Sequence, residues 1–479
     1  MRRSGLTLAA LAGLIATLGV TPAVSAVPPP TTLAVPRPWA VAGTPDAPST
    51  PTPTLTPTPT GDPHPRPAAP TDRTTYDMTA TYQVTAHIGW LSRAVGVDTT
   101  IDITNTSGGP VGRLALNTTA AAIGSMRLGR VVVDGKRVQP RVSGQTILVT
   151  LPQTLAEGVS TRVRVVYSGR AGLSTLGHDW MWAKGNDVLN LYRWIPWLSR
   201  TLPFQRDNHG DPFVTPTSPE VRVSITADRR LTYATSGVRT GVHGLTQTFV
   251  ARNVRDFNLT ASPSYAVRSQ RTKDGQTVIN VYTIHGRADL LMRSAQRAFR
   301  TYEAEIGQYP WPEFNVAESA GGYAMESPGL IWMPMEKFTD SDVRYITAHE
   351  TGHQWFYGVV GNDQTTDMFA DEAMTDFISR RLTNRMRSSY CAEDRFDKTL
   401  YQYSGACYFE VIYVQGSRFI DQIRRHMGDR LFWHTIQQYY ADNQFDISSD
   451  KRLLDALRGA AGSWVMPRYR ARFPTLYGS

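Results

Sequence analysis

The sequence predicts an α+β chain in which a β-rich N-terminal region precedes a mainly helical one. Between residues 75 and 268, apolar and polar residues alternate with period two, as in Thr81–Ala86 and Val221–Ile225. From residue 269 to 479 the pattern becomes helical, beginning with the apolar spacing from Leu290 to Tyr302. Period two is typical of half-buried strands and a period of 3.6 of amphipathic helices. We therefore expect two folded domains, 75–268 and 269–479.

The β-rich region combines many short strands with polar turns, which favours an antiparallel β-sandwich or saddle. Asp134-Gly135 lies between two apolar runs and predicts a tight hairpin, because both turn positions favour positive φ. Four tryptophans fall within this region. They are Trp180, Trp182, Trp194 and Trp197. Such a group either packs in a core or between domains, or forms a platform for a ligand.

The first 74 residues predict export rather than a folded domain. Arg2 and Arg3 precede the apolar run Leu6–Val20 and the small-residue sequence before position 27, so residues 1–26 resemble a secretory signal peptide. Residues 27–74 hold nearly half of the 31 prolines and predict a disordered Pro/Thr-rich linker. We expect a secreted, extracellular or cell-envelope-associated protein without a transmembrane segment, because no later run resembles a stop-transfer helix.

Composition and charge exclude two broad classes of protein. Hydrophobic residues at 41% and charged residues at 19% are enough to bury a core, which excludes wholesale disorder. The formal net charge is +9, but no run of basic residues exceeds three, so we expect no nucleic-acid partner. The diffuse positive charge leaves room for loose contact with anionic cell-envelope polymers. In an exported protein, Cys391 and Cys407 predict one disulfide, with two buried free thiols as the alternative.

The strongest motif is His349-Glu350-Thr351-Gly352-His353, an H-E-x-x-H sequence in a segment with helical pattern. Residues four apart share a helix face, so both imidazoles can bind one Zn²⁺, and Glu350 is placed to act as a general base. Glu372 follows after eighteen residues, again in a helical pattern, and is the candidate third ligand. Two histidines and one glutamate leave a coordination position open, as in catalytic zinc sites. The alternative for Glu372 is an ordinary surface carboxylate.

These motifs together resemble the aminopeptidase N-type zinc metallopeptidases, which belong to the gluzincins. The zinc motif and Glu372 have that family's spacing, and Tyr323-Ala324-Met325-Glu326-Ser327 is similar to its G-x-M-E-N strand. Downstream, Tyr413-Val414-Gln415-Gly416 is similar to its Tyr-x-x-Gly element. The resemblance implies a β-sandwich or saddle domain followed by a thermolysin-like, mainly helical catalytic domain. It also implies one Zn²⁺ per chain, held by His349, His353 and Glu372, and peptide substrates.

The resemblance implies a role for each matched residue. Glu326, with Ala324 and Met325 beside it, would bind the substrate and its free α-ammonium group. Glu350 would accept the proton of the attacking water, and Tyr413 would donate a hydrogen bond to the oxyanion. The sequence departs from the family at Tyr323, which stands at the first glycine of G-x-M-E-N, and at Ser327, which stands at its asparagine.

Three functions are compatible with these residues. The first is a secreted zinc aminopeptidase. The second is an endopeptidase, or a hydrolase of larger peptides with an open site, favoured by the altered G-x-M-E-N strand and by the lack of a counterpart to the helical domain that covers the site in many members. The third is an envelope-binding protein with a vestigial zinc site. The intact ligand set and Glu350 argue against this third function, because a binding module needs no general base.

Overall fold

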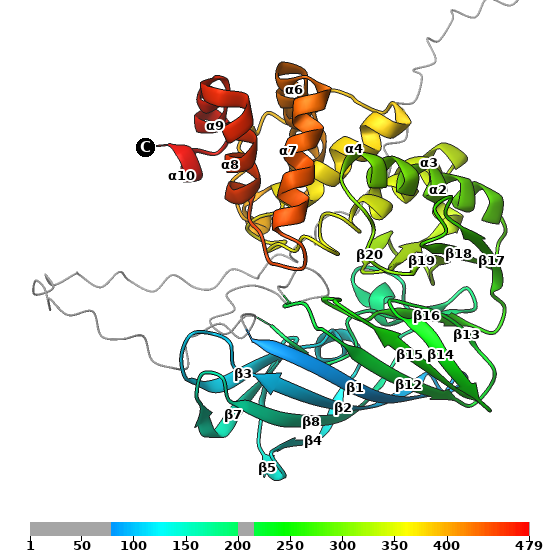
Figure 1. The fold of residues 1–479 in the computed structure, drawn as a ribbon. Coiled ribbons are helices and arrows are strands. Elements are labelled where there is room, and N and C mark those ends of the chain that lie inside the picture. Colours follow the sequence, from blue (N-terminus) through cyan, green and yellow to red (C-terminus); the bar gives the residue numbers. More distant parts are fainter. Residues whose placement is uncertain (1–77, 200–214, 479) are drawn as a thin grey trace, which may run out of the picture. The chain divides into compact units, whose positions relative to one another are not determined.

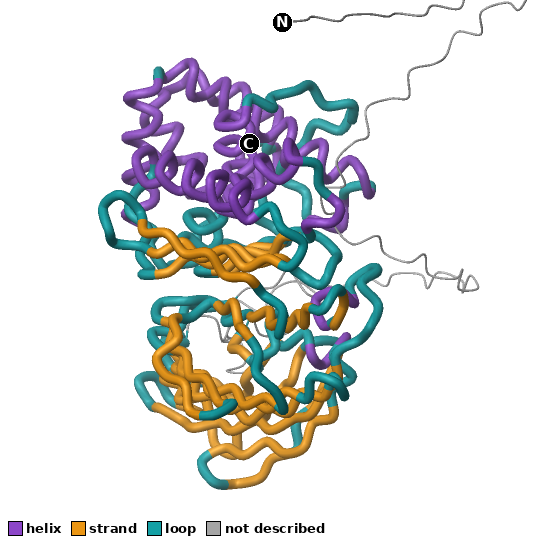
Figure 2. The backbone as a smooth tube through the Cα atoms, turned by 90° about the vertical axis from the view of Figure 1, so that its right-hand side faces the viewer, coloured by secondary structure: helices purple, strands orange, loops and turns teal. Residues whose placement is uncertain are grey.

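The computed structural model describes residues 78–199 and 215–478 (Figure 1). The predicted signal peptide, residues 1–26, and the predicted linker, residues 27–74, lie outside the described residues. Strands fill the first part of the described chain and helices the last part, as the sequence colours of Figure 1 show. Figure 2 draws the strands in orange and the helices in purple. The predicted fold class is therefore confirmed: a β-rich N-terminal domain is followed by a mainly helical one.

The largest sheet of the β-rich domain has eight strands in the order β14-β15-β12-β1-β2-β8-β4-β5. Neighbouring strands are antiparallel except β1 and β12, which run parallel. Along β1 buried residues alternate with more exposed ones, so one face of this strand packs against the core. The strands of this sheet are β1 (Thr79–Ile88), β2 (Ala94–Thr104), β4 (Arg127–Val133), β5 (Lys136–Val138), β8 (Ser160–Arg170), β12 (Val221–Ala227), β14 (Val238–His243) and β15 (Thr246–Ala251).

Two four-stranded sheets complete this domain, in the orders β11-β3-β7-β6 and β13-β16-β10-β9. Their strands are β3 (Val111–Asn117), β6 (Arg141–Ser143), β7 (Thr146–Leu155), β9 (Lys184–Gly185), β10 (Val188–Leu191), β11 (Trp197–Leu198), β13 (Thr232–Thr235) and β16 (Leu259–Ser262). The domain also contains two short helical segments. Segment α1 (Ala120–Ile123) follows β3, and η3 (Asp179–Trp182) precedes β9.

The structure contains the predicted hairpin and buries the four tryptophans. Asp134 and Gly135 have φ of 47° and 80° and join β4 to β5, as expected for a tight hairpin. All four tryptophans are at most 3% exposed, so they pack the interior and do not form a ligand platform. Trp180 belongs to a core cluster that also contains Trp332 and Met325 from the second domain.

The second domain begins with a five-stranded sheet in the order β17-β18-β19-β21-β20. Helix α2 (Ala288–Glu305) connects the parallel strands β18 and β19, and the two edge strands β17 and β20 are antiparallel to their neighbours. The predicted division at 268/269 falls within β17, which pairs along its whole length with β18. The strands are β17 (Ala266–Arg271), β18 (Val278–Thr283), β19 (Glu313–Glu318), β20 (Met325–Ser327) and β21 (Leu330–Met333).

The remaining elements are helical, and the periodicity from Leu290 to Tyr302 is confirmed by α2. They are η4 (Met335–Lys337), α3 (Asp340–Gly352), η5 (Phe369–Ala373), α4 (Met374–Thr383), η6 (Leu400–Gln402), α5 (Gly405–Tyr408), η7 (Phe409–Gln415), α6 (Gly416–Met427), α7 (Asp429–Asp442), α8 (Asp450–Ala461), η8 (Gly462–Val465), α9 (Met466–Arg472) and α10 (Pro474–Tyr477). Within the described part of the chain, no helix combines the length and apolar character needed to cross a bilayer.

The two cysteines form the predicted disulfide, with Cα atoms 5.7 Å apart. The bridge joins Cys391, in an irregular segment after α4, to Cys407 in α5. It therefore closes a loop directly before η7, the segment that contains Tyr413.

Candidate metal centre and active site

Helix α3 places His349 and His353 on one buried face. Thr339 and Asp342 form a reciprocal capping box that fixes its start, and His353 is the C-cap residue at its end. The two imidazoles are one helical turn apart and only 6% and 1% exposed. Their Nε2 atoms converge to 3.2 Å. The helix alone therefore supplies two of the three predicted ligands in a shared geometry.

Glu372 completes a triangle with these two nitrogens. It lies in η5, a π-helical turn that leads into α4, and its Oε2 is 3.4 Å from Nε2 of each histidine. A tetrahedral zinc ion with ligand distances of 2.0–2.1 Å has ligand atoms about 3.3–3.4 Å apart. The Glu372 Oε2 atom is buried and accepts no hydrogen bond from the described residues. The donor set and its dimensions fit a Zn²⁺ ion.

Two further carboxylates face the outer nitrogens of the histidines, and sequence reasoning assigned neither of them a role. Asp371 Oδ1 is 2.7 Å from His353 Nδ1, and Asp376 Oδ1 is 3.6 Å from His349 Nδ1. The Asp371 contact favours a proton on His353 Nδ1, which leaves the lone pair of its Nε2 free for a metal. Asp376 is too far from His349 Nδ1 for a hydrogen bond, and this nitrogen has no hydrogen-bond partner among the described residues. Their distance from Glu372 along the chain could have indicated them, because Asp371 directly precedes Glu372 and Asp376 follows it by one helical turn.

Burial and mutual repulsion dominate the electrostatics of this cluster. Burial, with the nearby charge of Glu326, raises the pKa of Glu350 well above its usual range. Burial also raises the pKa of Asp371 to about 7. Burial opposes the charged form of His353, but the surrounding carboxylates outweigh it and raise the pKa of this imidazole. Burial likewise opposes the charge of Glu372, but the two imidazoles outweigh it and hold its pKa low. Protons and a dication therefore compete for this cluster.

Glu326 lies on the edge strand β20 and reaches the same centre. It is 7% exposed, and a carboxylate oxygen lies within 4.8 Å of ligand atoms of Glu350 and His353. Met325 and Ala324 are 8% and 4% exposed, and Met325 packs in the core cluster. Of the three residues predicted to bind substrate, Glu326 is thus the one whose side chain the structure brings to the metal centre.

Gln364 connects Glu326 to the histidine partner Asp371. Its Nε2 donates to Glu326 Oε1 at 3.0 Å and to Asp371 Oδ2 at 3.2 Å. Its Oε1 accepts from Arg193 Nη2, in the β-rich domain, at 3.5 Å. No sequence pattern indicated Gln364, because it lies between the motifs and belongs to none of them.

A buried polar network of the β-rich domain continues from Arg193. This guanidinium donates to Tyr357 Oη at 2.6 Å, and Tyr357 donates to Asp256 Oδ2 at 2.5 Å. Burial raises the pKa of Asp256 to about 6 and lowers that of Arg255 to about 10. The first domain therefore contributes fixed charges close to the metal centre, in addition to its packing surface.

Tyr413 lies over the metal ligands from the opposite segment, η7. Its ring stacks on His349 with centroids 5.5 Å apart, and the residue is 4% exposed. Burial, followed by the adjacent Glu372 carboxylate, raises the pKa of the Tyr413 hydroxyl. Of the rival tyrosines, Tyr439 hydrogen-bonds Ser448 at 2.9 Å, and Tyr408 packs edge-on against Tyr413.

Comparison with known proteins yields one curated relative and several solved structures of similar fold. No family model matches the chain. Aminopeptidase N of Lactococcus lactis subsp. lactis is 24% identical over 240 residues, which are 41% of this chain. The chain spans 28% of the length of that relative.

The structural matches extend over most of the described chain. A point mutant of a two-domain M1 zinc metallopeptidase bound to L-arginine has a TM-score of 0.63 at 18% identity, over 81% of this chain and 91% of the other. The M1 zinc metallopeptidase from Deinococcus radiodurans has a TM-score of 0.62 at 18% identity, over 82% and 94%. A mutant of the same protein bound to a Tyr-Ser-Ala substrate has a TM-score of 0.58 at 18% identity, over 82% and 94%. The chain therefore has the two-domain fold of M1 zinc metallopeptidases, and the resemblance to the aminopeptidase N type is confirmed.

Proposed function

We propose that this chain is a zinc-dependent metallopeptidase that removes residues from the free N-terminus of peptides. The observation that carries the proposal is the group of three ligand atoms separated by 3.2–3.4 Å, with two further carboxylates beside them. The ligands are His349, His353 and Glu372. The similarity in fold to M1 zinc metallopeptidases supports the same activity.

Glu350, Tyr413 and Glu326 each have a separate role in the proposed reaction. When bound, Zn²⁺ supplies Lewis-acid chemistry and lowers the pKa of a water molecule. Glu350 takes the proton of the attacking water and passes it to the leaving amine. Tyr413 donates its hydroxyl proton in a hydrogen bond to the oxygen on which negative charge develops. Glu326 binds the α-ammonium group of the substrate and so places the first peptide bond at the centre.

One experiment tests the metal and the base together. His353→Ala should lose stoichiometric zinc, whereas Glu350→Gln should keep it and lose at least about a hundredfold in kcat. Glu336→Gln, an exchange at an exposed glutamate outside the centre, is the matched control and should keep both zinc and activity. Zinc is measured by elemental analysis and turnover with an unblocked peptide. A zinc-loaded Glu350→Gln protein with near-normal turnover would overturn the assignment of the base.

The endopeptidase alternative depends on the departure at Tyr323. This side chain stands where the resembled motif has glycine, and its ring packs edge-on against Trp180 with centroids 6.3 Å apart. A bulky residue just before β20 changes the surface along which a substrate backbone can lie. The two activities differ in their need for a free N-terminus, which is the basis of the first prediction in the Discussion.

We also propose that the protein is exported and acts outside the cell or at the cell envelope. The sequence of residues 1–26 and the disulfide support this location. Loose contact with anionic envelope polymers is part of the same proposal, supported by the net charge of +9. N-terminal sequencing of the protein recovered from the culture medium tests export, and salt-dependent release from envelope fractions tests the contact.

A further inference from the structure

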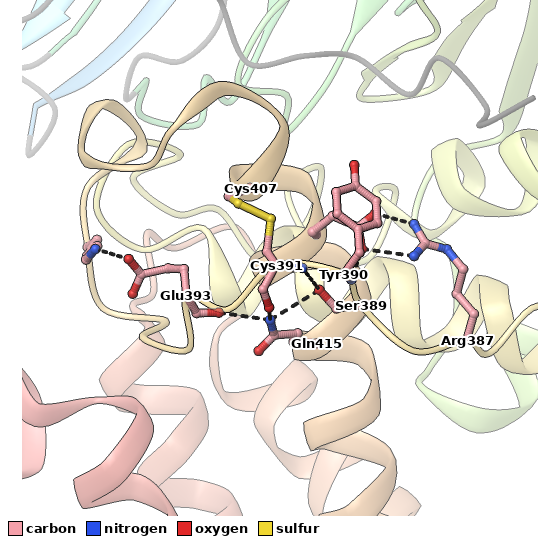
Figure 3. The surroundings of a disulfide bond; sticks show 9 residues. Arg387, Ser389, Tyr390, Cys391, Glu393, Cys407 and Gln415 are labelled. Carbon is pink, nitrogen blue, oxygen red and sulfur yellow. Dashed lines mark hydrogen bonds and ion pairs between the residues drawn. A yellow bond between two sulfur atoms is a disulfide. The ribbon is translucent and has the colours of Figure 1, made fainter. Parts of the chain in front are cut away.

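The loop closed by the disulfide is fastened to the segment that carries Tyr413. Figure 3 shows the Cys391–Cys407 bridge with the side chains around it, including Gln415, which reaches the loop from η7. Cys407 directly precedes Tyr408, whose ring packs edge-on against that of Tyr413. The disulfide therefore joins the loop to the chain a few residues before Tyr413.

A second connection lies one turn before Tyr413, at Glu410. This carboxylate is fully buried and accepts two hydrogen bonds from the Arg387 guanidinium, one of them at 2.9 Å. It also accepts the backbone N–H of Tyr390 at 3.3 Å. Removing the cationic partner of a buried carboxylate strongly destabilises the folded protein. The Arg387–Glu410 ion pair therefore fixes residues 387–390 against η7.

A third connection lies two residues after Tyr413, at Gln415. Its Nε2 donates to the carbonyl oxygens of Cys391 and Glu393 at 3.1 and 2.9 Å, and to Ser389 Oγ at 3.2 Å. Its Oε1 accepts from Arg472 Nη2 at 2.5 Å. The amide group of Gln415 thus donates to the loop and to Ser389 just before it, and accepts from Arg472 in α9.

The end of this segment also packs against the residue that follows the ligand Glu372. Gly416 follows Gln415, and a Cβ atom at this glycine would lie 2.6 Å from the Cβ of Ala373. Ala373 is the residue after Glu372, so the backbone carrying Tyr413 lies as close to the ligand segment as glycine permits. The contacts with residues 387–393, the disulfide and the close packing at Gly416 together leave the Tyr413 ring little freedom relative to His349.

We propose that Glu410, Gln415 and the Cys391–Cys407 disulfide are positioning residues that hold the Tyr413 hydroxyl at the reacting oxygen. The proposal rests on the function assigned to Tyr413 above. An oxyanion donor contributes through its preorganised position, so a displaced segment costs turnover more than substrate affinity. The loop then affects catalysis only by positioning Tyr413, and none of its own residues contacts the substrate.

The test uses substitutions rather than dithiol reductants, because thiolates bind zinc. Gln415→Ala and the double variant Cys391→Ser/Cys407→Ser are each made in the wild-type chain and in Tyr413→Phe. Gln402→Ala is the matched control: it lies in the same loop, but its side chain caps η6 and accepts from Thr399 N instead of holding η7. Each protein is measured for zinc content, thermal unfolding, kcat and KM.

In the wild-type background, Gln415→Ala and the cysteine variant should retain zinc and KM, and kcat should fall about tenfold. In Tyr413→Phe the same changes should have no further effect on kcat, because the positioned group is already gone. Gln402→Ala should leave kcat unchanged in both backgrounds. An equal fall in kcat in both backgrounds would show that the loop acts on stability or on another residue, and would overturn the proposal.

A second measurement does not depend on peptidase activity. Hydrogen–deuterium exchange of backbone amides in residues 409–415 should be faster in Gln415→Ala and in the cysteine variant than in the wild type or Gln402→Ala. Unchanged exchange would overturn the positioning role. If instead Tyr413→Phe itself keeps full kcat, the catalytic assignment of Tyr413 fails, and the exchange result still shows whether the loop orders this segment.

Discussion

Replacing Glu326 by alanine should penalise only those substrates that carry a free α-ammonium group. Glu326 is 7% exposed, and Gln364 donates to its Oε1, which leaves Oε2 for the substrate. Glu326→Gln is the matched variant, because it keeps the shape of the side chain and removes its charge. Both changes delete the counter-charge of the ammonium and leave the zinc ligands in place.

The size of the effect follows from the burial of this carboxylate. A hydrogen bond to a charged group contributes roughly 1.5–3 kcal/mol. Two opposite charges about 4 Å apart near a protein surface attract with about 4 kcal/mol. We therefore expect Glu326→Ala to lose about 2–4 kcal/mol of transition-state stabilisation for free substrates, which is about 30- to 1000-fold in kcat/KM.

The assay compares a free peptide and its N-acetylated form in the wild type and in Glu326→Ala, all normalised to zinc content. Acetylation should strongly reduce kcat/KM of the wild type, and the acetylated peptide should be nearly indifferent to the substitution. If both peptides lose activity by the same factor, the coupling between Glu326 and the ammonium is zero. That result would refute the aminopeptidase assignment and favour an endopeptidase with the same metal centre.

Three further predictions concern a histidine partner at the metal centre, the close packing at Gly416 and the His285–Glu318 pair. Asp371→Asn removes the carboxylate that orients a zinc-ligating imidazole, so zinc affinity should fall about 10- to 100-fold in competition with a chelator; unchanged affinity would exclude this role. Gly416→Ala places a methyl 2.6 Å from Ala373, so the free energy of unfolding in denaturant should fall by about 1–3 kcal/mol, and an unchanged value would contradict the close packing. The hydrogen bond to Glu318 raises the pKa of His285, so this imidazole should titrate above 6.5 by NMR; the pair stabilises the fold below about pH 6.5, and this contribution is lost as the pH rises through the folded-state pKa.

Local periodicity and spacing were enough to predict that a β-rich region precedes a helical one and that His349 and His353 share a helix face. His349 and His353 could be paired because a helix repeats every 3.6 residues, and the start of the helical region was visible from Leu290 onward. The two cysteines allowed only one intramolecular pairing, which the structure contains. Each of these predictions depends only on residue types and on their separation along the chain, and both can be read from the sequence.

The tertiary structure alone decided the partners that arrive from distant segments. Asp371 and Asp376 face the outer nitrogens of the histidines, and Gln364 joins Glu326 to Asp371. Their positions depend on how η5 and the 364 region pack against α3 and β20, and side-chain contacts across such packing leave no period in the sequence. For the same reason the sequence could place Tyr413 near the metal only by resemblance, and could not reveal that Gln415 and the disulfide loop hold its segment in place.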